Sequence, residues 1–155
     1  MNRLSVDVRG LTKVLDNLNS KIDAIPFKLK KGLIKAGLLI QREAQKIVPV
    51  DTGNLRASAF VAWDTGGRGI SPSFSDDNRD RAKLRMQHAD AIQEAQHEAK
   101  TAEPTVVVGF SAHYAIIQHE NYPIKRNPEK EWKYLESAIK RNESRILDEI
   151  RSTVK

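Results

Sequence analysis

The chain changes character at one ten-residue segment, positions 49–58, which reads PVDTGNLRAS. Pro49 has no backbone N–H and drives the residue before it toward extended geometry, so a helix that reaches this point must end. Asp51 and Thr52 accept bonds from backbone N–H groups, and Gly53 tolerates positive φ, which is typical of turns. The segment therefore predicts a turn between a helix before it and a strand after it.

Two helical stretches precede this segment. Apolar residues recur at helical spacing from Leu11 to Ile25 and again from Leu29 to Ile47. Pro26 is expected to interrupt or kink the helix between the two stretches. Gly32 and Gly37 lie inside the second stretch at a cost of about 1 kcal/mol each relative to alanine, and we attribute them to close packing against a sheet. The second stretch has this apolar stripe: Leu29, Leu33, Ala36, Ile40, Ala44 and Ile47.

Two stretches after the turn have strand character. Leu55 to Trp63 alternates small and apolar residues, and Thr105 to Phe110 is rich in β-branched residues. They are expected to pair as an antiparallel hairpin with an enlarged connection. Arg3 to Arg9 also alternates, which predicts a short edge or terminal strand.

The enlarged connection, residues 64–104, is interpreted as an insertion. It begins with a Gly/Ser/Pro-rich run and continues as a helical stretch, Arg79 to Lys100, without Gly or Pro. The apolar face of that helix is thin, because it consists mainly of alanines: Ala82, Met86, Ala89, Ile92, Ala95 and Ala99. We expect a partly helical, flexible assembly arm that a neighbouring subunit orders. A helix folded back on its own sheet is the alternative.

The C-terminal part predicts two more helical elements. A helical turn over Ser111 to Glu120 is expected to turn Tyr114, Ile117 and Ala115 inward. Asn127 is placed to cap a last helix that begins with Pro128. The apolar face of that helix is expected to comprise Trp132, Leu135, Ile139, Ile146 and Ile150.

These elements predict an α+β fold in one domain, residues 1–155. A small antiparallel sheet of three to four strands would pack against two or three long helices, with the helical insertion between two strands. A chain of 155 residues is long enough for one core, and the absence of cysteine excludes disulfides and Cys-based metal or nucleophile chemistry. No apolar run has the length of a membrane span, and the first ten residues lack the apolar core of a signal peptide.

The formal net charge is +6, and the excess of basic residues is concentrated on the second helical stretch. Such a face is either solvated or turned toward an acidic or phosphate-bearing partner. A small basic nucleic-acid-binding protein is therefore an alternative function. Phe60, Trp63 and Phe110 could serve as stacking platforms, but core packing is the favoured interpretation because the basic residues lie elsewhere.

Candidate sites for catalysis or metal binding are weak. His113, His119 and Glu120 do not have the spacing of a known metal motif. Ser58 and Ser111 are not in a nucleophile-elbow motif, so a hydrolase is a distant third hypothesis. His88 and His97 are expected to be exposed on the insertion helix. We expect no enzyme activity, no metal and no cofactor.

Several short blocks, taken in order, resemble a known family. They are VPVDTGNLRAS at 48–58, VGF at 108–110, HYA at 113–115, HE at 119–120 and KYLESA at 133–138. Together they resemble the gene-product-ten-like neck and tail-completion proteins of long-tailed phages, also called minor tail or minor capsid proteins. The chain departs from the pattern in the length of residues 64–103 and in Asn121-Tyr122, which stand where many members have Gly-Thr.

The resemblance implies a structural virion protein without catalysis. It implies a homo-oligomeric ring, for which we expect six copies, joining the tail to the head connector after synthesis in the bacterial cytoplasm. Other tail and head-connector proteins would be its partners, and neither a specific nucleic acid nor a membrane is expected. The residues matching the family motif are Pro49, Asp51, Thr52, Gly53, Leu55, Arg56, His113, Tyr114, Ala115, His119, Glu120 and Leu135. The candidate interface residues are Arg56, Arg81, Arg85, Met86 and Ile92.

Overall fold

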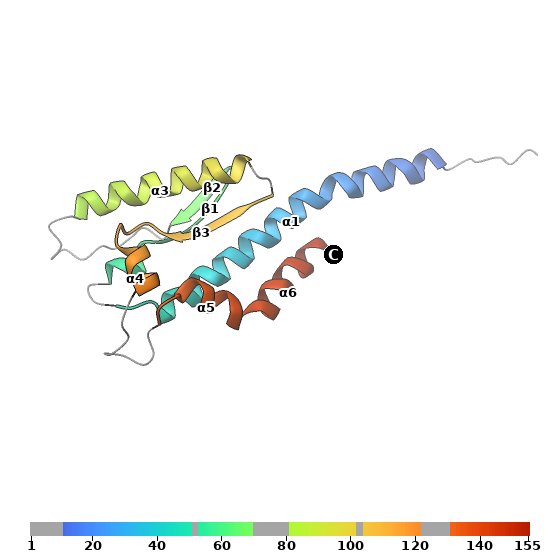
Figure 1. The fold of residues 1–155 in the computed structure, drawn as a ribbon. Coiled ribbons are helices and arrows are strands. Elements are labelled where there is room, and N and C mark those ends of the chain that lie inside the picture. The colour runs from blue at the N-terminus through green and yellow to red at the C-terminus, as the bar shows by residue number, and fades with distance from the viewer. Residues whose placement is uncertain (1–10, 51–52, 70–80, 102–103, 122–130) are drawn as a thin grey trace, which may run out of the picture.

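A computed structural model describes residues 11–50, 53–69, 81–101, 104–121 and 131–155. Six helices and three strands lie within these ranges (Figure 1). In chain order they are α1 (Leu11–Ile47), α2 (Asn54–Ala57), β1 (Ala59–Trp63), β2 (Gly66–Gly69), α3 (Arg81–Thr101), β3 (Val106–Phe110), α4 (Ala115–Asn121), α5 (Tyr134–Arg141) and α6 (Glu143–Val154). The expected strand at Arg3–Arg9 and the expected cap at Asn127-Pro128 lie outside the described residues.

The three described strands form one antiparallel sheet in the order β2-β1-β3. Ala59 pairs with Phe110 and Trp63 with Val106, so the predicted pairing of the strands that flank the insertion is confirmed. β1 begins at Ala59 rather than at Leu55, because Asn54–Ala57 forms the single helical turn α2. The α+β class, a small antiparallel sheet against long helices, is confirmed.

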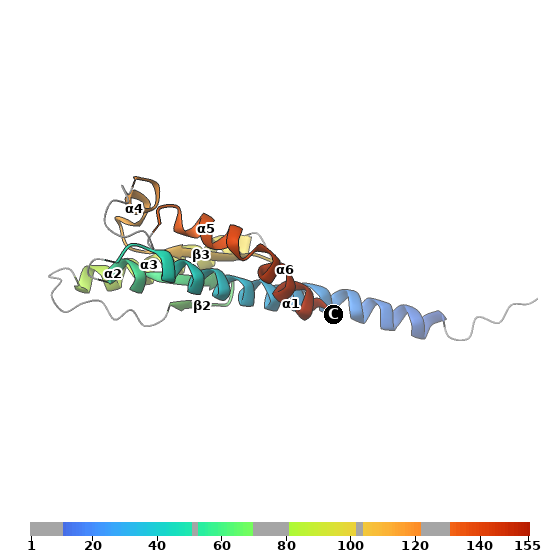
Figure 2. The same cartoon turned by 90° about the horizontal axis from the view of Figure 1, so that it is seen from below.

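The elements stack in layers, with α3 on one face of the sheet and α1 on the other (Figures 1 and 2). A Cβ atom on Gly37 of α1 would lie 3.0 Å from side-chain carbons of both Val61 and Val106, so glycine lets the helix approach the sheet closely. Gly32 serves a different contact: its Cβ would lie 3.0 Å from the Cα of Ile150. Gly37 therefore packs on the sheet as expected, whereas Gly32 makes room for α6.

The two helical stretches predicted around Pro26 are one continuous helix of 37 residues, so the predicted interruption is wrong. Proline removes the hydrogen bond that its own nitrogen would donate to the carbonyl four residues earlier, at Ile22, and its ring crowds that carbonyl. Pro26 and Ile22 are both exposed, so water can satisfy that carbonyl. The stripe expected for the second stretch is buried or half-buried throughout.

The expected last helix is divided into α5 and α6 at Asn142, which is 9 % exposed. Its side-chain Nδ2 donates to the carbonyl of Ala138 at 2.9 Å, and its backbone N–H donates to Ile139 at 3.1 Å. The predicted face is partly wrong, and α5 begins at Tyr134, so Trp132 lies before the helix. Trp132 and Ile139 are 48 % and 46 % exposed.

The helix of the insertion, α3, packs on the sheet. Phe60 and Ala62 of β1 form a buried cluster with Ala95 of α3. The buried face of α3 comprises Leu84, His88, Ala95 and Ala99, whereas Ala82, Met86 and Ala89 of the predicted face are exposed. This arrangement corresponds to the alternative in which the helix folds back on its own sheet. The burial of Phe60 agrees with core packing, which the sequence favoured over a role of this ring as a stacking platform.

Candidate functional site

The blocks that carry the family resemblance lie far apart in the sequence but meet in one apolar cluster. Val48 and Leu55 from either side of the turn, Ala115 at the start of α4, and Tyr134 and Ala138 in α5 belong to it, each at most 5 % exposed. We call this group of buried residues the motif cluster. Its remaining buried members are Ala44 and Ala112, and half-buried Ile47, Phe110, Tyr114 and Leu135 pack around it.

Tyr134 joins the parts of the motif cluster. Its phenol O–H donates to the carbonyl of Ala115 at 3.1 Å. Its ring meets Phe110 and His119 edge-on, at centroid distances of 4.9 and 4.8 Å. Burial raises the pKa of Tyr134 to about 12, so the phenol remains a neutral donor near neutral pH. Tyr134 is therefore a packing anchor between α4 and α5.

The turn after α1 depends on Gly53, which has a φ of 82°. The backbone N–H of Val48 still donates to Ala44 at 2.9 Å, after which buried Pro49 ends the helical pattern. The predicted positive φ at Gly53 is confirmed. Asp51 and Thr52 lie outside the described residues, and the side chain of Arg56 is exposed.

The histidine and glutamate residues of the motif do not form a metal centre. His113 is exposed and stacks edge-on against Tyr114, with a centroid distance of 5.1 Å. His119 Nδ1 lies 2.8 Å from Glu120 Oε1, and this hydrogen bond lowers the pKa of the Glu120 carboxyl. In the described ranges, no group of three or more His, Cys, Asp or Glu side chains is placed to hold a metal ion.

Burial of the α4 residues differs from the prediction in one position. Ala115 is buried and Tyr114 half-buried, as expected, but Ile117 is 62 % exposed and neighbouring Ile116 is 76 % exposed. A shallow open pocket lies beside them, lined in part by Ile116, His119 and Leu135. α4 therefore exposes two large apolar side chains, Ile116 and Ile117.

His88 of α3 is buried, so its predicted exposure is wrong. Its Nδ1 lies 2.7 Å from the hydroxyl of Ser111, and that hydroxyl is 3.3 Å from the carbonyl of Ser58. Burial lowers the pKa of His88. A serine beside a histidine is the beginning of a nucleophile pair, but here both groups bind the insertion helix to one end of the β1–β3 pair, where Ser58 precedes β1 and Ser111 follows β3. The arrangement is a chain of partly buried hydrogen bonds that holds α3 against the sheet.

The candidate interface residues do not form one surface. Arg85 is exposed and Met86 is 67 % exposed, whereas Arg81 is half-buried. Ile92 is half-buried and packs against the cluster of Phe60, Ala62 and Ala95.

A row of exposed apolar side chains that was not predicted lies on the N-terminal part of α1. We call residues 13–27 of α1 the arm, because Figure 1 shows this part projecting beyond the rest of the fold. The following side chains of the arm are exposed: Val14 62 %, Leu15 46 %, Leu18 52 %, Ile22 52 %, Ile25 47 % and Phe27 73 %. The sequence signal was present as an amphipathic stripe, but nothing in it shows that these side chains are exposed in the described part of the fold.

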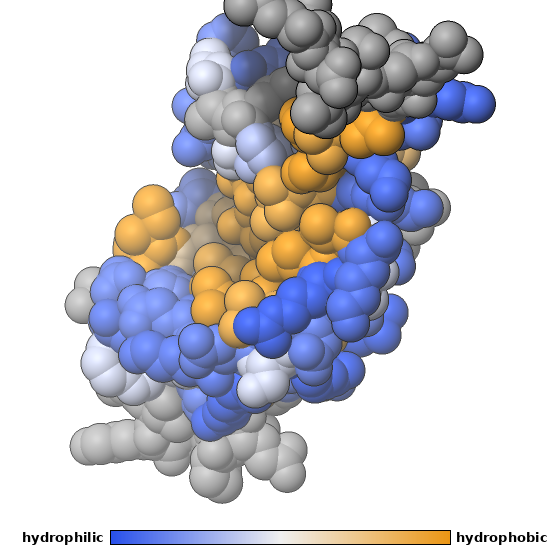
Figure 3. Space-filling model, turned by 90° about the vertical axis from the view of Figure 1, so that its right-hand side faces the viewer, coloured by the Kyte–Doolittle hydropathy of each residue, from blue (hydrophilic) through white to orange (hydrophobic). Residues whose placement is uncertain are grey.

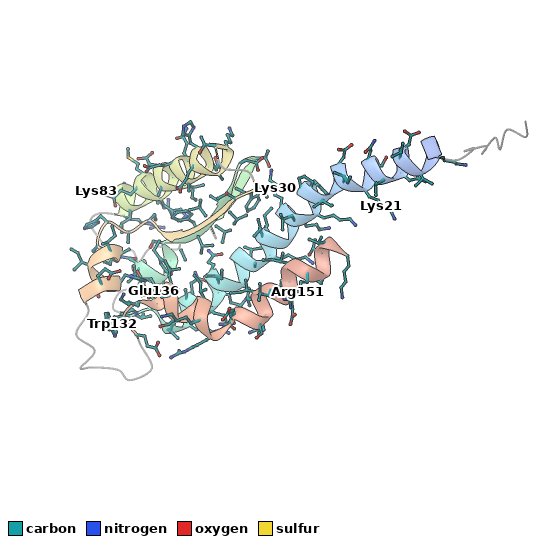
Figure 4. All side chains as sticks on the ribbon, turned by 45° about the vertical axis from the view of Figure 1, so that its right-hand side comes forward. Lys21, Lys30, Lys83, Trp132, Glu136 and Arg151 are labelled. Carbon is teal, nitrogen blue, oxygen red and sulfur yellow. The ribbon has the colours of Figure 1, made fainter. Side chains whose placement is uncertain are left out.

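A basic stripe runs along the solvent side of α1. At about 100° per residue, its members fall within an arc of about 80°, and they are Lys21, Lys28, Lys31, Lys35, Arg42 and Lys46. Lys30 lies outside the stripe and forms an ion pair with Asp64 beside the sheet. Figure 4 shows Lys21 on the arm, beyond the end of α6, and Lys30 farther along the same helix.

Comparison of the chain with protein families, with curated proteins and with solved structures finds no match. Among the described helices, none is both long and apolar enough to cross a membrane.

Proposed function

We propose that this chain is a structural protein of a phage particle. In this proposal it is a neck or tail-completion subunit that assembles with copies of itself into a ring joining the tail to the head connector. The observation that carries the proposal is the motif cluster, because the separate blocks that resemble the family pack against one another around Tyr134.

The distribution of apolar surface supports an assembly role. The arm exposes a row of apolar side chains, and Ile116 and Ile117 of α4 are exposed as well. In Figure 1 the arm and α4 lie at opposite ends of the molecule. Exposed apolar surface of this kind usually marks contacts with other proteins. A subunit with such surfaces at both ends suits contacts with more than one neighbour.

Particles made without this protein would test the proposal by negative-stain electron microscopy. We expect separated heads and tails, or tails with an abnormal length or ending, because the junction would lack its adaptor. Supplying the wild-type gene in trans should restore joined particles and serves as the control. Normal, joined particles in its absence would refute the proposal.

A nucleic-acid-binding protein is the second candidate, and the basic stripe on α1 favours it. A protein that contacts several phosphates loses affinity steeply with salt, by about a thousandfold or more between 50 and 200 mM for six contacts. Fluorescence anisotropy with a short DNA duplex would measure this loss. Lys31→Glu/Lys35→Glu should abolish such binding, whereas Lys83→Glu, at an exposed position on α3, is the matched control. Salt-insensitive or absent binding would eliminate this candidate.

A further inference from the structure

The strand β3 lies at an edge of the sheet. Among the described residues the strand order is β2-β1-β3, so β3 is bonded to another strand on one side only. Natural proteins commonly protect an edge strand with lysine, proline or a bulge, because its unpaired backbone groups pair readily with another strand. β3 contains no charged residue, no proline and, over its five paired residues, no bulge. The side chains of Val106 and Val108 are half-buried. The edge is therefore suited to receive a further strand.

The register identifies the backbone groups that face this edge. The backbone N–H of Ser111 donates to the carbonyl of Ser58 at 3.0 Å. Hydrogen-bonded pairs alternate along an antiparallel ladder, so Val107 is bonded to β1 as well, whereas Val106 and Val108 occupy the non-bonded positions. The N–H and C=O groups of Val106 and Val108 therefore point toward the open edge, where they can bond the backbone of an added strand.

The chain itself contains a segment with the pattern of such a strand. Residues 3–9, which lie outside the described residues, read RLSVDVR. Apolar Leu4, Val6 and Val8 alternate with polar residues, as in a strand with one buried face. α1 begins directly after this segment, at Leu11. The segment is therefore attached to the outer end of the arm.

The length of α1 keeps this segment away from the β3 of its own chain. Gly37 of α1 lies against β3, because its Cβ would be 3.0 Å from a side-chain carbon of Val106. Between Leu11 and Gly37 the helix rises by about 39 Å, at about 1.5 Å per residue. From Leu11 back to Arg3 an extended chain spans at most about 29 Å, at about 3.6 Å per residue. With α1 continuous, residues 3–9 cannot lie along β3 of the same subunit.

We propose that residues 3–9 of one subunit add as a fourth strand to β3 of a neighbouring copy of this chain. The inference deepens the ring assembly proposed above and rests on it, because it identifies the contact between adjacent subunits. The donated segment and the accepting edge are different parts of the chain, so the contact is heterologous and can repeat from subunit to subunit until a ring closes. Direct pairing of two β3 edges would instead be isologous and would stop at a dimer.

The arm gives this contact its reach. It projects beyond the rest of the fold and adjoins residues 3–9 directly (Figure 1). Figure 3, viewed from the side toward which the arm projects, shows apolar surface with hydrophilic surface on both sides. A donated strand brings this end of the molecule to the neighbouring subunit, where burial of apolar surface adds to the strand pairing.

The first test blocks the donated strand and measures association by sedimentation velocity over a range of protein concentrations. Wild-type protein should associate as concentration rises. Val6→Pro/Asp7→Pro should weaken association by at least about tenfold, because proline has no N–H and adjacent residues point to opposite edges of a strand. Both positions precede α1, so the thermal melt should not change. Asn2→Pro, just outside the segment, is the matched control and should leave association unchanged. Monomeric wild-type protein, or association unaffected by the double variant, would overturn the proposal.

The second test blocks the accepting edge. Val106→Pro removes an N–H that points toward the open edge, and proline is tolerated at the first residue of an edge strand. This protein should therefore keep its thermal melt and lose self-association. Mixed with the Val6→Pro/Asp7→Pro protein, it should form a complex of two chains and nothing larger, because one intact donor and one intact acceptor remain. A mixture of two folded variants that stays monomeric would overturn the proposal.

The third test, residue-resolved hydrogen exchange on wild-type protein, does not depend on the fold of an acceptor variant. In the monomer the amide of Val107 should be protected by its bond to β1, whereas the amides of Val106 and Val108 should exchange rapidly. Association should protect Val106 and Val108 together with amides of residues 3–9. Protection of β3 alone would indicate that two β3 edges pair. Protection of residues 3–9 in a proven monomer would indicate pairing within one chain, and either result would overturn the proposal.

Purified protein and particles together separate this inference from the neck role on which it rests. Strand donation fails if the purified protein does not associate as described, even where particles without it are defective. The neck role fails if particles made without the protein are normal, even where the purified protein associates through residues 3–9.

Discussion

Gly53 illustrates a residue whose backbone conformation, rather than its packing, restricts substitution. Its φ is 82°, and a Cβ atom built on it would meet nothing within 4 Å. Gly53→Val should therefore destabilise the fold through backbone strain alone, by about 1–3 kcal/mol. Gly53→Asn should cost less, because asparagine tolerates the left-handed region. Urea unfolding measures both, and a Gly53→Val protein as stable as wild type would contradict the turn geometry.

His88 predicts a dependence of stability on pH. Burial lowers its pKa in the folded protein below the ordinary histidine value of 6.5. The unfolded chain therefore binds more protons in the interval between the two values, and the free energy of unfolding rises with pH there. The contribution of His88 is fully present above pH 6.5 and is lost as the pH falls through the lower, folded value.

Urea unfolding at pH 7.5 and 5.5 tests this dependence. Wild-type protein should lose more stability on acidification than His88→Gln does. His97 is exposed on the same helix, so His97→Gln should behave like wild type and serves as the control. Equal losses for His88→Gln and wild type would show that this histidine does not titrate on unfolding.

At the scale of elements, substitutions in α3 distinguish a helix that is docked on the sheet from one that is detached in the free subunit. Leu84 is 3 % exposed, so Leu84→Ala should cost about 2–5 kcal/mol if the helix is docked in the free subunit. Met86 is 67 % exposed, and Met86→Ala should change stability by less than about 0.5 kcal/mol. Thermal melts of a dilute monomer measure both. Negligible effects of both substitutions would instead favour the interpretation of α3 as part of an insertion that a neighbouring subunit orders.

Strand pairing and the turn could be predicted because their signals are local. The β-branched run at Val106–Val108 and the turn residues around Gly53 specify structure within a few positions of themselves. The docking of α3 could not be predicted in the same way. Small residues such as Ala95 and Ala99 offer little area, but they permit close approach to a sheet whose position only the tertiary fold reveals.

The errors at Pro26 and Asn142 also have physical causes. A proline costs one hydrogen bond and about 3 kcal/mol in a helix interior, yet α1 continues through Pro26 at an exposed position where water can reach the freed carbonyl. Asn142, in contrast, ends α5 by bonding with its own side chain to Ala138. The candidate site was predicted as a set of residues, and their convergence around Tyr134 depends on contacts between distant segments.

At the scale of the whole molecule, α1 consists of two parts that differ in their tertiary packing. Residues 33–47 lie between the sheet and the C-terminal helices, whereas the arm exposes its apolar side chains. Figure 2 shows α1 extending past the end of α6. Pro26 lies near the junction and cannot donate to the carbonyl of Ile22. The hydrogen-bond ladder is thus weakest near the point where tertiary packing ends.

Hydrogen exchange should reveal this division. A helical segment of about 15 residues without packing is marginally stable in water, so amides of residues 13–25 should exchange rapidly in dilute, monomeric protein. Amides of residues 33–47 should be protected up to the stability of the fold and serve as an internal reference in the same helix. Equal protection along all of α1 in a proven monomer would show that contacts within the chain hold the arm.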